Sequence, residues 1–276
     1  MFWLLVPSWS QKNFWRPLQK PENLVLRGHW NDLPALTLFA LDREAYRQYL
    51  MDLSQKAPQS NFEIQLPMPD GSWETFRIKE SPVMEPELAA KFPEIKTYAG
   101  SGGGHYMRLS ISPYSFQAYI LTDQGDVVIE APDYNLSHIL AVFKGNELEV
   151  REGVQLSCGT QELNSIISED VQHHTPNLSM RSPQGEPVNL RTYRLALACT
   201  GEWGSDPSRG GGTTQTAIDK MVASLSYINA VYEKDVAIHM NLIANNDKLV
   251  FLQPATDPYG TPTSGGWGSV WVSGGL

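Results

Sequence analysis

The sequence predicts an α+β fold, in which a strand-rich N-terminal unit precedes an incomplete α/β sandwich. Short segments that alternate between polar and apolar residues recur as far as Glu152, which is typical of half-buried strands. A polar stretch without an apolar period follows at residues 153–190 and predicts a linker. Beyond it the order becomes strand, long helix, strand and strand, with which an α/β sandwich begins.

The N-terminal unit, at residues 12–152, is expected to hold two short helices among its strands. Asp42 is a suitable N-cap for the first of them. Asp70 and Gly71 supply the positive-φ turn that a hairpin needs. Helices are expected at residues 43–53 and 85–92, and strands at 24–27, 36–41, 61–66, 73–79, 95–99, 106–111, 116–122 and 127–131.

The C-terminal unit begins at residues 191–200, whose apolar continuity predicts a strand buried on both faces. A glycine-rich loop, Gly201–Gly212, leads to the clearest helix of the chain. Apolar residues recur every three or four positions over Thr214–Tyr232, and Thr213 or Thr214 can cap this helix. The helix can cover one face of its sheet, so the other face is expected to be apolar and exposed. The remaining strands are expected at residues 236–243 and 248–252.

Composition restricts the class of protein. The chain has 276 residues, of which 30 are acidic and 21 basic, so its formal charge is −9. Such a composition excludes a wholly disordered chain and a collagen-like repeat, and its acidity argues against a nucleic-acid partner. No apolar run approaches the roughly 20 residues of a membrane span. Residues 1–11 are apolar without a basic start, which fits either a signal-peptide remnant or an apolar first strand.

The residues contain no self-contained catalytic or metal motif. None of the six histidines lies four positions from another, so no His-Glu-x-x-His pair can share a zinc ion. His239 is expected to be a structural histidine on a strand. The glycine-rich segments lack the phosphate-binding fingerprints, and no nucleophile elbow occurs. The carboxylate pairs Glu130/Asp133 and Glu233/Asp235 are expected at the surface.

Two cysteines, Cys158 and Cys199, leave three possibilities open. They can form one bridge, remain two free thiols, or include one thiol with a task. Cys199 lies in the expected buried strand and is interpreted as an inert apolar residue, whereas Cys158 lies in or near a loop.

Several stretches resemble the precursors of secreted bacterial reprolysin-like zinc metallopeptidases, which belong to the metzincins. Glu80–Gly100 resembles the propeptide of that family, and Arg191–Trp203, Ile228–Asp247 and Thr256–Tyr259 resemble the start of its catalytic domain. The resemblance implies a propeptide-like domain at residues 12–152 and the first part of a metzincin-like catalytic sandwich at residues 191–255. Residues 256–276 form a Gly/Ser-rich tail.

This chain departs from the family pattern after Tyr259. The family's zinc helix, His-Glu-x-x-His-x-x-Gly-x-x-His, lies downstream of the segment that matches Thr256–Tyr259, and it does not occur here. The resemblance therefore implies a zinc metalloendopeptidase zymogen whose full-length parent binds zinc and cleaves a protein or peptide substrate. This chain is expected to be an inactive fragment that holds no zinc, catalytic residue or other cofactor.

The resemblance also gives Cys158 and the linker a role. Metzincin prodomains can hold latency with a Cys-Gly whose thiolate takes zinc's open position, and Cys158-Gly159 lies just ahead of the linker. Cys158 is therefore a candidate latency ligand, against the alternative of an incidental thiol. An activating protease is expected to cleave the linker, with Arg181 or Arg191 as candidate residues. Secretion to the extracellular space is implied. Two alternatives remain, a non-catalytic secreted binding or adhesion module and an unrelated enzyme.

Overall fold

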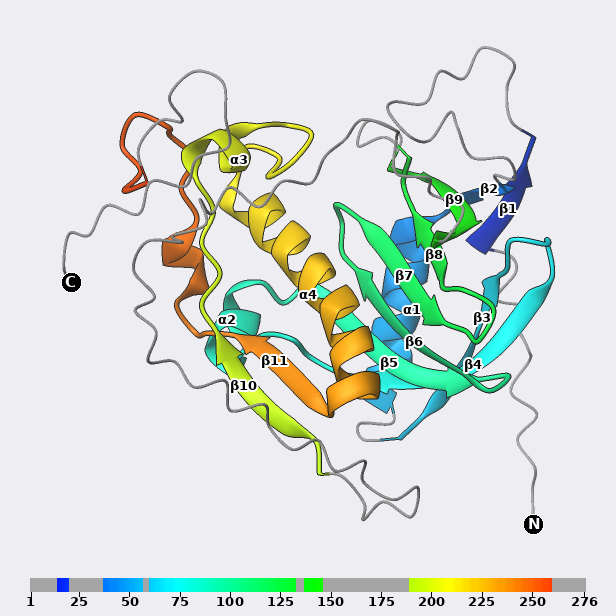
Figure 1. The fold of residues 1–276 in the computed structure, drawn as a ribbon. Coiled ribbons are helices and arrows are strands. Elements are labelled where there is room, and N and C mark those ends of the chain that lie inside the picture. Colours follow the sequence, from blue (N-terminus) through cyan, green and yellow to red (C-terminus); the bar gives the residue numbers. More distant parts are fainter. Residues whose placement is uncertain (1–13, 20–36, 57–59, 133–136, 146–188, 260–276) are drawn as a thin grey trace, which may run out of the picture.

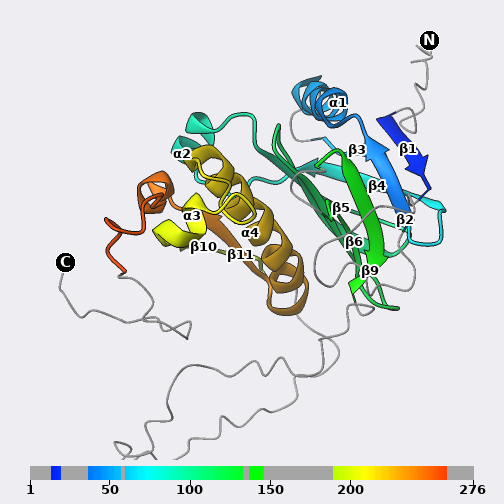
Figure 2. The same cartoon turned by 90° about the horizontal axis from the view of Figure 1, so that it is seen from above.

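The computed structural model describes residues 14–19, 37–56, 60–132, 137–145 and 189–259. Their elements stack in layers in the order α1, a nine-stranded sheet, α4 and a two-stranded sheet (Figures 1 and 2). Helix α1 spans Arg43–Lys56 and helix α4 spans Thr214–Val236. The predicted mixture of helices and strands is confirmed, and a large curled antiparallel sheet lies at its centre.

The large sheet has the strand order β1-β2-β9-β8-β7-β6-β5-β4-β3, and every neighbouring pair is antiparallel. From β3 to β9 the strands follow chain order. β9 then pairs with β2, so the two N-terminal strands, β2 and β1, complete the sheet at that side. The strands are Trp15–Leu18 (β1), Thr37–Leu41 (β2), Phe62–Pro67 (β3), Trp73–Glu80 (β4), Lys96–Gly102 (β5), His105–Ile111 (β6), Phe116–Leu121 (β7), Val127–Glu130 (β8) and Ile139–Lys144 (β9).

The main core lies between one face of the large sheet and α1. Side chains alternate along a strand, so Met107, Leu109 and Ile111 of β6 all point to this face. Tyr46 and Leu50 of α1 are fully buried against it. The opposite face of β6 is left free to meet another layer.

Local sequence signals place the hairpin and the helix starts as predicted. Gly71 turns the chain between β3 and β4 with a φ of +81°. Asp42 begins α1, because its Oδ1 accepts a hydrogen bond from the Ala45 amide at 3.2 Å. Thr213 caps α4 by accepting from the Thr216 amide at 3.2 Å, and the Thr216 hydroxyl accepts from the Thr213 amide at the same distance.

Helix α4 lies between the two sheets and packs on both (Figure 2). One side meets the outer face of β6 and β7, where Tyr119 and Tyr227 stack edge to face with ring centroids 4.1 Å apart. The other side forms a second core with β11 and with α2, which spans Pro86–Lys91. This core contains Val83, Met84, Leu88, Phe92, Ile95, Cys199, Ile218, Met221, Val222, Leu225 and Leu242. Residues from both halves of the chain therefore share one core.

The small sheet pairs β10, Arg191–Leu195, in parallel with β11, Ile238–Leu242. The prediction that residues 191–200 form a strand buried on both faces is wrong. The first four residues of β10 are exposed, and Tyr193 retains 49% of its accessible surface. The apolar run begins only at Leu195, where the strand ends, so the buried residues follow the strand instead of forming it.

Two other C-terminal elements differ from prediction. The expected strand at residues 248–252 is a 3-10 helix, Asn246–Leu249, followed by a single β-bridge from Val250 to Cys199. The buried Asn246 side chain bonds both the amide (2.9 Å) and the carbonyl (3.1 Å) of Leu197, and so takes the place of a neighbouring strand. Within the expected loop at 201–212, Gly201–Ser205 forms helix α3.

Two strands were not predicted. β9 has no polar alternation, because its four central residues are all buried. β1 is only four residues long, and Pro17 interrupts its pattern. The expected strand at 24–27, the segment 1–11, the linker and the tail after 259 lie outside the described residues. Among the described helices, none is long and apolar enough to span a bilayer.

Candidate functional site

Residues 83–85 attach the N-terminal half of the chain to the small sheet. The Leu242 amide donates to the Val83 carbonyl at 2.9 Å, and the Glu85 amide donates to the Leu242 carbonyl at 2.9 Å. Met84 thereby forms a parallel bridge with Leu242 on the edge of β11. This segment extends the small sheet as a third strand would, which is the geometry of β-augmentation.

Charged contacts flank this attachment. Glu85 accepts hydrogen bonds from the Arg194 guanidinium and, at 2.7 Å, from the Ala244 amide. The bond from Arg194 is the main reason that the pKa of Glu85 lies below its usual value. Lys91 and Asp247 form an ion pair at 2.7 Å. Both ion pairs are partly exposed, so we expect them to orient residues 83–85 on the small sheet more than to add to the stability of the fold.

A buried polar network joins the outer face of β6 to the end of α4. Arg108 is 1% exposed, and its Nη1 donates to Glu233 Oε1 at 2.7 Å. Its Nη2 donates to the Ser81 carbonyl at 2.9 Å, and the Tyr106 hydroxyl donates to Glu233. Burial and the hydrogen bond to Glu233 contribute to a raised pKa of Tyr106, about 12. The expected surface position of Glu233 is therefore wrong, since its side chain is 11% exposed.

His239 of β11 completes this network. Its Nδ1 lies 2.5 Å from Glu233 Oε1, and its Nε2 lies 2.9 Å from Asn241 Oδ1 and 3.2 Å from the Pro82 carbonyl. Both ring nitrogens are engaged, which agrees with the prediction of a structural histidine. Because both nitrogens already have protein partners, neither is left to bind a metal.

We expect Glu233 to make folding sensitive to acid. Burial raises its pKa, but the hydrogen bond from His239 and the charge of Arg108 more than offset this, so the pKa lies below its usual value. A lowered folded-state pKa stabilises the fold above the unfolded value of about 4.3, and this stabilisation is lost as pH falls through the folded value. Urea unfolding between pH 3 and pH 6 should therefore show a shallower acid loss for Glu233→Gln than for the wild type. The exposed Glu87→Gln is the matched control, and equal slopes for all three chains would contradict the expectation.

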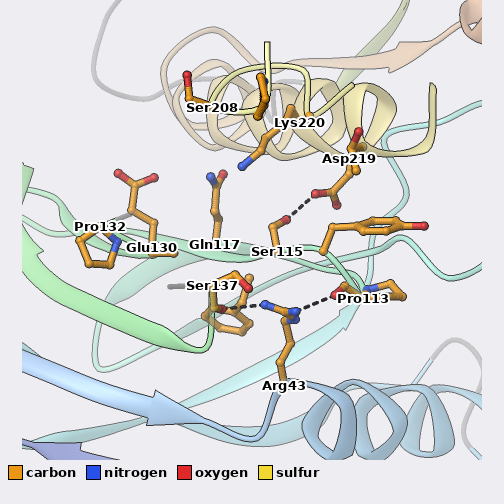
Figure 3. A pocket seen from close by; sticks show the side chains of 16 residues that line it. Arg43, Pro113, Ser115, Gln117, Glu130, Pro132, Ser137, Ser208, Asp219 and Lys220 are labelled. Atoms are coloured by element: carbon orange, nitrogen blue, oxygen red, sulfur yellow. Dashed lines mark hydrogen bonds between the residues drawn. The ribbon is translucent and has the colours of Figure 1, made fainter. Parts of the chain in front are cut away.

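A cleft of about 680 Å³ opens between the N-terminal half of α4 and the ends of strands β7 and β8 of the large sheet (Figure 3). Asp219 and Lys220 line it from α4, Glu130 lines it from the end of β8, and Arg43 lines it from the start of α1. Gln117 and Glu130 also line a second cavity of about 480 Å³ farther along α4. The junction between α4 and the sheet is thus incompletely filled.

Asp219 is the most buried charged group of this cleft. The residue has no exposed surface, and its Oδ2 accepts a hydrogen bond from the Ser115 hydroxyl at 2.7 Å. Among the described residues its Oδ1 has no hydrogen-bond partner. Burial raises the pKa of Asp219, although the hydroxyls of Ser112 and Ser115 oppose the shift.

The other three charges face the cleft without a partner of opposite sign at ion-pair distance among the described residues. Burial raises the pKa of Glu130 and lowers the pKa of Arg43. Arg43 donates to the carbonyls of Ser137 at 2.7 Å and Pro113 at 2.6 Å. The expected surface position of Glu130 therefore needs correction, because this carboxylate lies in the wall of a cleft.

The predicted site residues have different outcomes. Cys158, the candidate latency ligand, lies outside the described residues, as do Gly159 and Arg181. Cys199 is a free, buried thiol, and burial raises its pKa, which agrees with an inert role. The charged cleft was missed, because its four charges come from three separate segments, α1, β8 and α4, and no local spacing connects these segments.

The described residues do not provide a zinc site. No three His, Cys, Asp or Glu side chains gather there as a metal would require. His239, the best-placed imidazole of the C-terminal half, already has partners on both nitrogens. We therefore derive no step through a metal from this part of the chain.

Comparisons with known proteins add no family. No family model matches the sequence, and no curated protein matches it. One similar solved structure is described as "Structure of a chaperone-substrate complex"; it is 12% identical, and the match covers 43% of this chain and 91% of that chain with a TM-score of 0.29. A TM-score this low carries no argument about fold or function.

Proposed function

We propose that the chain is part of the precursor of a secreted, reprolysin-like zinc metalloendopeptidase, with the large sheet as propeptide. In this proposal β10, α4 and β11 are the opening of the catalytic domain. The large sheet holds them in place before activation by a protease that cleaves within about residues 160–190. Zinc and the peptide-bond chemistry belong to the full-length parent.

The observation that carries the proposal is the packing of α4 and β11 against the N-terminal half of the chain. A propeptide must bind its catalytic domain in a defined geometry, and three independent contacts do so here. They are the bridge of residues 83–85 to β11, the core shared by α2 and α4, and the buried network around Glu233. The first two involve Glu80–Gly100, the stretch that resembles the family propeptide.

Cleavage between the halves should leave them associated. We would insert a site for a sequence-specific protease after Met180, cut the full chain to completion and apply it to a size-exclusion column at neutral pH. The two pieces are expected to elute together, because separating them would expose the second core and the charges of Arg108 and Glu233. The uncut chain is the control, and separation without denaturant would contradict the proposed role of the sheet.

The peptidase assignment has a direct test in the gene. The proposal expects the codons that follow Leu276, in the same or a shifted frame, to encode His-Glu-x-x-His-x-x-Gly-x-x-His. Its absence from all forward frames would overturn the assignment. The alternative of a secreted binding module is favoured by one observation, the charged cleft beside α4, and would then take precedence.

A further inference from the structure

The cleft beside α4 holds two acidic and two basic side chains, none of which forms a hydrogen bond or ion pair with another of these four described residues. Lys220 and Arg43 act on Asp219, and Lys220 acts on Glu130, only at longer range. Asp219 leaves one buried oxygen without a hydrogen bond, and neither Glu130 nor Lys220 makes a hydrogen bond or ion pair with another described residue. Arg43 bonds only carbonyl oxygens among these residues. Asp219 is fully buried, and Arg43, Glu130 and Lys220 are half-buried. Burying a charge without a direct partner destabilises a fold, so this set of charges around one cavity indicates a ligand that pairs with them.

The arrangement of the charges limits the class of ligand. Two carboxylates alone would suit a cation, but Lys220 and Arg43 oppose one. A lone anion would meet Asp219 and Glu130. The walls instead carry equal numbers of each sign (Figure 3), so the best partner has one ammonium and one carboxylate.

The size of the cleft and its uncharged lining residues also fit a small peptide. A cleft of about 680 Å³ falls in the range of small-ligand sites and exceeds what a single amino acid needs. The Ser115 hydroxyl adds a polar group bonded to Asp219, and Tyr114, which is 39% exposed, adds apolar surface to the lining.

We propose that this cleft binds a short peptide with both termini free. Its ammonium binds the unpaired oxygen of Asp219, and its carboxylate binds Lys220 and Arg43. The bound peptide bridges α4 and the large sheet and so stabilises their contact. The inference goes beyond the proposed function and does not depend on it, because the residues that line the cleft are not part of the argument for a peptidase precursor.

The test is calorimetric titration of the full chain at pH 7 with a panel of dipeptides that vary both side chains. Each dipeptide is compared with its N-acetylated and its C-amidated form, which remove one charge at a time. We expect saturable binding of at least one free dipeptide, and a loss of about tenfold or more on blocking either end. No binding across the panel, or equal binding by blocked forms, would overturn the inference.

Asp219→Asn distinguishes a binding residue from a structural one. Asp219 is fully buried and its Oδ1 has no hydrogen-bond partner among the described residues, so its charge is expected to be unfavourable in the folded state, in line with the raised pKa that burial causes. The amide keeps the shape, so we expect the unliganded variant to melt about 2–4 °C higher than the wild type while it loses dipeptide binding. A lower melting temperature together with unchanged binding would refute the role of Asp219.

Lys220→Met completes the design. This variant should weaken the free dipeptide about tenfold and leave the C-amidated form unchanged, because it removes a partner of the carboxylate. Lys234→Met is the matched control, since Lys234 is an exposed lysine of α4 that does not line the cleft. Equal effects of the two variants would place the ligand elsewhere. All these readouts are independent of the elution of the cleaved halves and of the gene sequence, so they can fail without affecting the proposed function.

Discussion

Arg108→Met is expected to destabilise the chain by about 3–5 kcal/mol, the usual loss when one member of a buried ion pair is removed. The variant leaves Glu233 with its negative charge at the α4–sheet junction and removes the donor to the Ser81 carbonyl. Methionine fills most of the volume, so the loss reports on charge and hydrogen bonding more than on a cavity. Urea unfolding at pH 7 measures it.

Arg77→Met is the matched control for this experiment. Arg77 is an exposed residue of β4 in the same sheet. We expect its replacement to change the free energy of unfolding by no more than about 0.5 kcal/mol. In the double variant Arg108→Met, Glu233→Gln the loss should be smaller than the sum of the single losses, because each partner is costly mainly when the other is left alone. Equal stability of Arg108→Met and Arg77→Met would mean that the network does not secure α4.

The parts of the fold that the sequence predicts are those governed by contacts a few residues apart. Gly71 forms its turn by its own backbone freedom, and Thr213 caps α4 through a residue three positions away. The three- and four-residue spacing of the apolar residues in α4 predicts the helix, although the helix packs on both sheets. These signals do not depend on the rest of the chain, and the structure agrees with each of them.

The surroundings of each element were harder to predict. β10 and β9 illustrate this in opposite directions, since one was expected to be buried and is exposed, and the other was not recognised because both of its faces are covered. Period-two alternation shows which side chains share a face but not which layer covers that face. The outer face of β6 carries Tyr106, Arg108 and Ser110, which reads as solvent-facing, yet α4 covers it.

The polar sites could not be predicted for the same reason, because the sequence does not show which layers pack against each other. Glu233 appeared to be a surface residue of α4, and its partner Arg108 lies 125 positions earlier in the chain. One signal was present, because Asp219, Ser226 and Asn229 are polar residues of α4 that lie among its apolar residues, and all three are buried. Polar residues on the buried face of a helix require partners, so they indicate that a second polar surface faces the helix.

Gly100→Ala should affect stability about as strongly as Arg108→Met. A Cβ at Gly100 would lie 2.0 Å from the Arg77 carbonyl oxygen and 2.7 Å from the Ile78 Cα, so β5 would have to move away from β4. Backbone atoms cannot rotate aside as a side chain can, so the clash cannot be relieved locally. We therefore expect a loss of about 3 kcal/mol or more by urea unfolding. Gly145→Ala is the control, because its Cβ would meet no described atom closer than 3.6 Å, and its effect should stay within about 0.5 kcal/mol. If both variants unfold at the same urea concentration, the close approach of β4 and β5 at Gly100 does not hold in solution.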